Sequence, residues 1–128
     1  MSAISRNDFL LSLASKDRNA FDAYIKRLHP IDVAHYLERS TDVELDTFIK
    51  FSDVHYKSRV LEQASIDMQI RFLEVLQYEE IVELFSLMSK DDVADTLSNL
   101  PMHKRKALLN EMKSSETQTI EALLGYSK

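Results

Sequence analysis

Apolar residues recur every twelve positions along most of this 128-residue chain, and this period limits its possible folds more than any other feature. From Leu13 to Leu109 the column at this spacing is apolar at all nine positions, and from Tyr24 to Ile120 the preceding column is apolar at eight of nine. At 45% apolar composition, a full column of nine arises by chance about once in a hundred over the twelve phases. The period therefore indicates a structural repeat. The full column contains Leu13, Ile25, Leu37, Ile49, Leu61, Leu73, Phe85, Leu97 and Leu109.

Each period predicts one short α-helix followed by a tight turn. A third column, three residues after the first, is also largely apolar, and together the three columns form the i, i+1, i+4 stripe of a helix. Turn and capping residues, among them His29-Pro30, Ser52-Asp53 and Ser89, fall between the stripes. Helices of about nine residues are marginal alone, so neighbouring helices must hold them. We therefore predict an all-α superhelix, or solenoid, of about nine or ten short helices. The alternative is a four-helix bundle, which needs longer uninterrupted periodicity.

The composition predicts a single folded domain in a reducing compartment. We expect residues 1–128 to form one domain, with residues 1–18 as a loosely attached first helix. The chain has no cysteine, which excludes disulfides and thiolate sites, and it contains no apolar run long enough to cross a bilayer. The expected location is therefore cytoplasmic, without direct membrane insertion.

Several function classes conflict with this composition. A net charge of −5 argues against nucleic-acid binding, which normally uses a basic face. Gly125 is the only glycine, so a glycine-rich phosphate cradle cannot form. The four histidines are scattered, without the helical spacing of zinc ligands, and no nucleophile–base arrangement is visible. We therefore expect that the protein is not an enzyme.

The segment KDDVADTLSNLP, from Lys90 to Pro101, places three aspartates close together on one predicted helix. Asp91 and Asp92 suit the first turn, where carboxylates meet free N–H groups and the positive end of the helix dipole; Ser89 and Asp92 also resemble a capping box with a shorter acid. Asp95 lies one turn beyond Asp91, and like charges at this spacing repel. A partner cation, either a protein group or a metal ion, would remove this conflict.

One basic cluster, residues 103–106, follows the acidic segment. Its sequence, His-Lys-Arg-Lys, is typical of a solvated helix face or of a local counter-charge to Asp91 and Asp92. The alternative is a weak site for an anionic surface.

Three segments in this order and spacing resemble the cytosolic N-terminal domain of the MgtE family of magnesium transporters. They are LHPIDVAHYL at residues 28–37, KDDVADTLSNLP, and the closing IEALLGYSK at residues 120–128. The resemblance extends from about residue 20 to the end of the chain.

This resemblance implies a regulatory domain that sits above paired CBS domains on the inner face of the cell membrane. In the family, cytosolic Mg²⁺ bridges acidic residues of this domain, the CBS domains and a pore-linked helix, and so holds a homodimeric channel closed. Asp91 and Asp95 match the family's acidic positions, and Asp92 is adjacent to them. One departure is Arg59, which stands where the family often has another acid, and which puts one of the bridging ions in question. CBS and transmembrane domains are absent from this chain, so Mg²⁺ should bind weakly to the isolated domain.

A second function remains open on the sequence alone. A solenoid surface commonly binds other proteins, so the chain could be a helical-repeat interaction scaffold without ion sensing. CBS domains and transmembrane helices in the same reading frame would favour the transporter interpretation.

Overall fold

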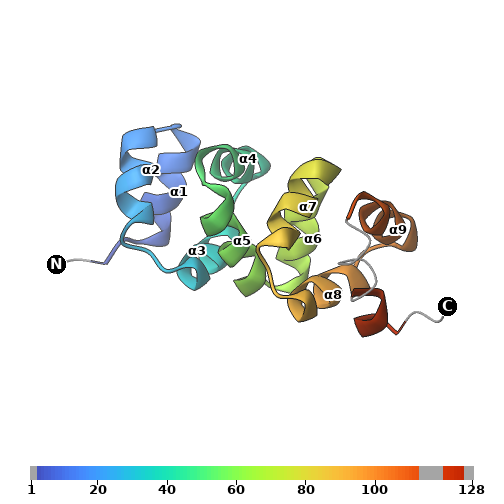
Figure 1. Cartoon of the computed structure of the whole chain (residues 1–128). Coiled ribbons are helices and arrows are strands. Elements are labelled where there is room, and N and C mark those ends of the chain that lie inside the picture. Colours follow the sequence, from blue (N-terminus) through green and yellow to red (C-terminus); the bar gives the residue numbers. More distant parts are fainter. Residues whose placement is uncertain (1–2, 113–119, 126–128) are drawn as a thin grey trace. The chain divides into compact units, whose positions relative to one another are not determined.

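The computed structural model describes residues 3–112 and 120–125 (Figure 1). Nine α-helices and a short helical turn at 120–123 lie within these ranges, and no strand is present there, so the all-α prediction is confirmed. The last three residues of the closing motif, 126–128, lie outside the described residues. The helices are α1 (Arg6–Ala14), α2 (Arg18–Ile25), α3 (Pro30–Leu37), α4 (Asp42–Phe51), α5 (Val54–Gln63), α6 (Ile66–Glu74), α7 (Tyr78–Ser86), α8 (Lys90–Ser98) and α9 (Met102–Glu111).

Each of these helices begins twelve residues after the one before it. The residue preceding most of the helices has an extended backbone and a side-chain oxygen that accepts a hydrogen bond from an N–H in the first turn, as at Ser5, Asp17 and Asp53. At α4 the exchange is reciprocal: the Glu44 N–H donates to Thr41 Oγ1 at 3.1 Å, and the Thr41 N–H donates to Glu44 Oε1 at 2.7 Å. The caps fix where each helix starts because they satisfy N–H groups that lack partners within the helix.

The twelve-residue columns form the core, as predicted. Every residue of the first column is buried except Ile25, which is half-buried. Thr96 is the polar exception in the preceding column, and it is buried with its Oγ1 donating to Gln69 Oε1 at 3.3 Å. The buried Thr96 hydroxyl is tolerated in this column because the Gln69 side chain accepts its hydrogen bond. A buried hydroxyl without a hydrogen-bond partner would lower the stability of the fold.

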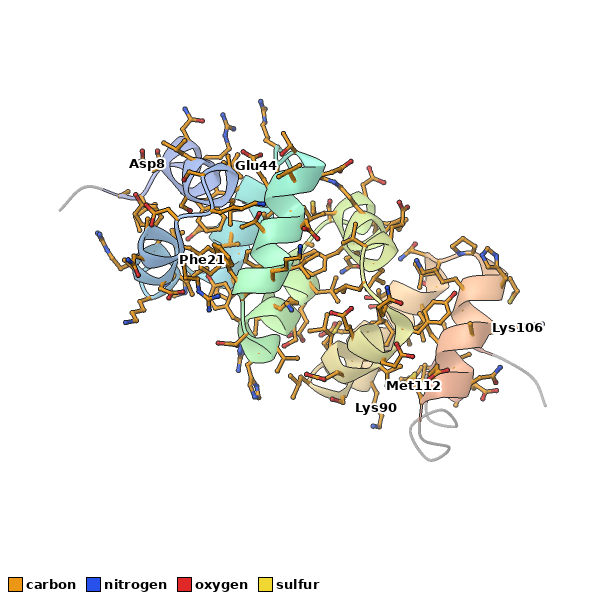
Figure 2. The ribbon with its side chains drawn as sticks, turned by 90° about the horizontal axis from the view of Figure 1, so that it is seen from above. Asp8, Phe21, Glu44, Lys90, Lys106 and Met112 are labelled. Atoms are coloured by element: carbon orange, nitrogen blue, oxygen red, sulfur yellow. The ribbon has the colours of Figure 1, made fainter. Side chains whose placement is uncertain are left out.

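The chain divides into two compact units, residues 1–68 and 69–128, with the boundary inside α6. In the first unit, α1 contacts α2, α3 and α4, and α3 packs on α5. Aromatic rings fill its centre, and Phe21 is one of them (Figure 2). Between ring centroids, Phe9 lies 6.0 Å from Phe21 and 6.5 Å from Phe48, and Phe21 lies 5.4 Å from Phe51. Contacts between helices two apart along the chain are those of a stacked helical repeat.

Helix α1 belongs to this aromatic core. Phe9 and Leu13 are fully buried, and the Tyr36 hydroxyl donates to the Ile4 carbonyl at 2.8 Å. The helix ends at Ala14, and Lys16, two residues later, has a left-handed φ of 55°. The Asp17 N–H donates to the Ser12 carbonyl and the Lys16 N–H to the Leu13 carbonyl. These two bonds form a Schellman motif, which glycine usually completes.

The second unit contains α7, α8 and α9 with the larger part of α6. Helix α7 packs against α9, so here too a helix contacts the one two places further along the chain. Ile120, in the short turn at 120–123, is 2% exposed and therefore belongs to this core. The buried side chains of this unit include Phe72, Leu73, Ile81, Leu84, Phe85, Val93, Leu97, Leu100, Leu108 and Leu109.

Candidate functional site

Helix α8 carries the three aspartates that the sequence singles out. It begins at Lys90, and the Asp92 N–H donates to Ser89 Oγ at 3.2 Å, which is one half of the expected capping box. Asp91 and Asp92 both lie in the first turn, where the helix dipole favours negative charge. Asp95 lies in the next turn, outside the reach of this stabilisation.

The opposite face of α8 anchors it in the second unit. Val93, Ala94 and Leu97 are buried, whereas Asp91 and Asp95 are exposed and Asp92 is partly exposed. None of the three carboxylates forms an ion pair with another residue in the ranges that the structure describes. Residues four apart on a helix have Cβ atoms about 6 Å apart, so Asp91 and Asp95 share one face and repel each other. The helix therefore presents uncompensated negative charge to solvent on a fixed support.

The spacing alone does not distinguish α8 from its neighbour. Glu79 and Glu83 of α7 are also four residues apart, exposed, and without an ion pair to the described residues. The density of carboxylates is the same as well, since α7 carries Glu79, Glu80 and Glu83 within five residues. What differs is the middle acid: Glu80 Oε1 accepts a hydrogen bond from the Gln77 N–H at 3.1 Å, as part of a capping box. The α7 pair is consequently a matched control for any role assigned to α8.

The described residues contain no group of three or more histidine or acidic side chains arranged to hold a metal ion. The histidines at positions 29, 35, 55 and 103 are all exposed. Carboxylate oxygens are the ligands that hard divalent cations prefer, so the α8 carboxylates can supply part of a ligand set.

The basic cluster makes different contacts from those expected on the sequence. Lys104 Nζ donates to the Leu73 carbonyl at 3.0 Å, at the end of α6. The Arg105 guanidinium donates to the carbonyls of Leu97, Ser98 and Leu100 at 3.0, 3.1 and 3.2 Å. These carbonyls lie at or just after the end of α8, where the last turn leaves acceptors without helical partners. Lys104 and Arg105 thus bind main-chain oxygens that sequence reasoning did not connect to them.

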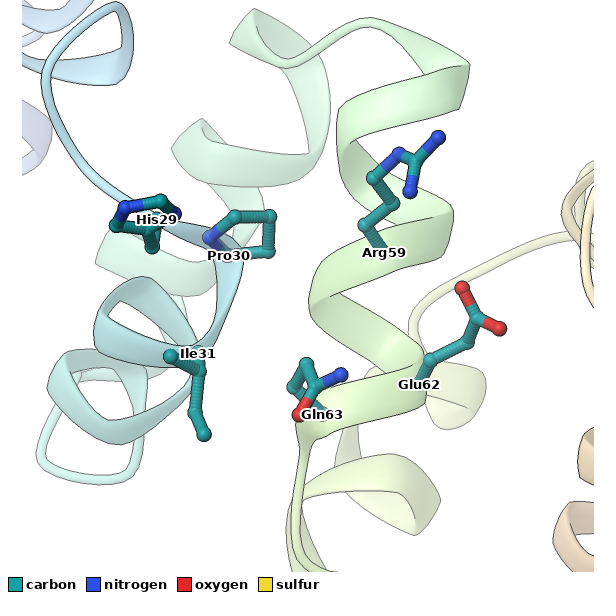
Figure 3. A pocket seen from close by; sticks show the side chains of 6 residues that line it. All are labelled: His29, Pro30, Ile31, Arg59, Glu62 and Gln63. Atoms are coloured by element: carbon teal, nitrogen blue, oxygen red, sulfur yellow. The ribbon is translucent and has the colours of Figure 1, made fainter.

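A second candidate location, which sequence reasoning missed, is a cavity of about 320 Å³ in the first unit (Figure 3). One wall is the start of α3, with His29, Pro30 and Ile31, and the other is α5, with Arg59, Glu62 and Gln63. Pro30 takes the first helical position, where its missing N–H costs nothing.

No helix among the described residues is long and apolar enough to span a membrane. The family model for the MgtE intracellular N domain matches residues 28–128, well over half of the chain. The chain belongs to the MgtE N domain family. No curated protein matches it.

Membership of the MgtE N domain family fixes the coarse function. Such a domain is the intracellular part of a magnesium transporter that also contains other domains, and its family is not a family of enzymes. The matched region contains the α3–α5 cavity and all of α8, while α1 and α2 precede it. The two candidate locations therefore both lie in the MgtE N domain proper.

Proposed function

We propose that residues 1–128 form one MgtE-type N-terminal domain that senses intracellular Mg²⁺ at the inner face of the cell membrane. Asp91 and Asp95, with Asp92 beside them, supply carboxylate ligands to Mg²⁺. CBS domains and the pore-linked helix of the same transporter supply the partner ligands, and the bridged state favours the closed channel. The observation that supports this role is the exposed, uncompensated carboxylate face of α8 in a chain of this family.

The donor chemistry fits Mg²⁺. This ion takes oxygen ligands in octahedral geometry, keeps several of its waters and is commonly bound through one or two carboxylates. Asp91 and Asp95 can provide such a partial ligand set from one helix face, which agrees with the lack of a larger cluster among the described residues. In the isolated domain the ion should bind weakly, with a dissociation constant of roughly a millimolar or more, because ligands from a second domain are missing.

Repulsion between the carboxylates gives the domain its response to falling Mg²⁺. Without the ion, Asp91 and Asp95 repel each other and any acidic surface that faces them. With the ion, the charge is neutralised and two domains share its coordination sphere, so the docked state gains free energy only when Mg²⁺ is present. In a homodimeric transporter this gain acts in both subunits.

The decisive experiment measures domain docking in a transporter chain that includes the CBS domains. Small-angle X-ray scattering and protease protection are recorded against Mg²⁺ concentration for the wild type and for Asp91→Asn combined with Asp95→Asn. The double variant removes two charges at nearly constant side-chain size. It should lose most of the Mg²⁺-dependent compaction while its circular dichroism spectrum stays unchanged.

The matched control is Glu79→Gln combined with Glu83→Gln, which removes the same charge at the same spacing from α7. This control should compact like the wild type. If the α8 variant compacts over the same Mg²⁺ range as the wild type, the aspartates are only helix-start residues. If the wild type itself does not respond to Mg²⁺, the chain is better explained as a helical-repeat interaction scaffold.

A further inference from the structure

The cavity between α3 and α5 is built on two helices that are held together at its edge. The Tyr56 hydroxyl donates to the Leu28 carbonyl at 2.8 Å, which ties α5 to the residue just before the turn into α3. Burial raises the pKa of Tyr56, and the Asp32 carboxylate raises it further, so the hydroxyl keeps its proton at physiological pH. The walls of the cavity are therefore preformed, and a ligand does not have to order them.

The cationic group of the cavity is Arg59. Its guanidinium is exposed on α5 and makes no ion pair or hydrogen bond with the described residues, whereas Glu62, the acid in the same lining, is already engaged by another group. By contrast, Arg18 pairs with Asp22 at 3.1 Å and covers the Phe51 ring at 4.9 Å. The Arg59 guanidinium is thus available to bind a carboxylate through two parallel hydrogen bonds.

The other side of the cavity is apolar. Ile31 is 46% exposed, and the Pro30 ring lies beside it. The His29 imidazole on this wall and the Gln63 amide on α5 add hydrogen-bonding groups to the lining. A ligand that matches this lining carries a carboxylate next to an aliphatic side chain.

We infer that the α3–α5 cavity binds an acidic peptide segment, with a Glu or Asp carboxylate on Arg59 and a neighbouring aliphatic side chain against Ile31. The volume is at the small end for ligand pockets, so it suits two adjacent side chains of a peptide and not a larger cofactor. The charge of Arg59 selects an acidic segment over a basic one. This site needs no metal ion and does not depend on the role proposed for α8.

The test uses the whole 128-residue chain, labelled with ¹⁵N, and follows amide shifts on titration with a blocked pentapeptide that has one glutamate between two leucines. Saturable shifts should map to residues 28–31 and 59–63, with a dissociation constant on the order of 1 mM or tighter. A peptide with glutamine in place of glutamate should bind about tenfold more weakly, because the charge-assisted hydrogen bonds are lost.

Three variants separate the roles of charge and shape. Arg59→Gln should weaken binding of the glutamate peptide about tenfold. Arg59→Lys should weaken it about threefold, because lysine keeps the charge but lacks the two parallel N–H donors of the guanidinium. Ile31→Ser should weaken it about threefold. The matched control is Arg39→Gln, an exposed arginine outside the cavity, which should bind like the wild type.

Four results would overturn the inference. They are equal binding of the glutamine peptide, a change below about twofold in Arg59→Gln, shifts that map elsewhere on the chain, and no saturable shift up to about 10 mM peptide. Acetate alone provides a further arm: if it saturates the same amides with the affinity of the peptide, the cavity takes a bare anion and the peptide assignment is wrong.

Discussion

Replacing Arg105 tests whether α9 fastens the end of the helix that carries the aspartates. Arg105→Met keeps most of the aliphatic stem and removes three hydrogen bonds to the carbonyls of Leu97, Ser98 and Leu100. Hydrogen bonds from a charged donor contribute about 1.5–3 kcal/mol when buried, but these carbonyls are partly hydrated and can bind water after the change. The expected loss is therefore about 2–3 kcal/mol in total, and Arg105→Lys should recover about 1 kcal/mol of it.

The assay is urea unfolding followed by circular dichroism, with hydrogen exchange of the α8 amides as the local measurement. Lys106→Met is the matched control, because Lys106 is exposed on α9 and no described residue pairs with it, so its effect should stay within about 0.5 kcal/mol (Figure 2). The same unfolding measurement in high salt separates two possible causes of the stability loss. Salt screens an attraction between Arg105 and the aspartates, whereas the hydrogen bonds from Arg105 to the carbonyls persist. If Arg105→Met costs under about 0.5 kcal/mol, or if its cost vanishes in high salt, the reasoning fails.

The remaining predictions concern stability. Leu61→Ala and Leu97→Ala should each lower the free energy of unfolding by about 2–5 kcal/mol in urea titrations, because both side chains are fully buried; two small losses would show that the column is not core. Lys16→Gly should raise the free energy of unfolding by up to about 1 kcal/mol, because φ is 55° at this position. Ala23→Gly inside α2 should lower the free energy of unfolding by about 1 kcal/mol. A change of the same sign in both variants would contradict the role of the left-handed residue. The folded pKa of Tyr56 is raised above its ordinary value of 10.0, so the stability it contributes is complete below that pH and is lost as pH rises above it; Tyr56→Phe should remove this alkaline decline, and an unchanged decline would refute the assignment.

The sequence predicts the helices and their buried faces well because both depend on local spacing. Leu37, Leu73 and Leu97 recur at the period of the repeat, and each is fully buried. Capping residues provide an additional signal for the starts of six of the described helices, at Ser5, Asp17, Thr41, Asp53, Ser65 and Ser89. His29 and Pro101, at the same spacing, make no side-chain cap bond. The burial of α1 depends instead on tertiary ring contacts of Phe9, which spacing along the chain does not describe.

The candidate sites are less predictable because they depend on which helices meet. Asp91 and Asp95 follow from helical spacing, but the targets of Lys104 and Arg105 lie on other helices, at the ends of α6 and α8. The cavity at Arg59 likewise requires the start of α3 beside α5, a contact between segments about thirty residues apart. Periodicity identifies the inner face of each helix, while pairings between helices come only from the folded chain.

The constant interval between helix starts also bears on how such a chain can change in length. Removing or duplicating an in-frame gene segment for one helix and its turn, such as residues 54–65, leaves the capping and core columns of the remaining helices in phase. Inserting a single codon within a helix instead rotates every later side chain of that helix by about 100°, which carries its apolar stripe away from the core. Related genes should therefore differ in length mainly by whole repeats, or by small insertions confined to the turns.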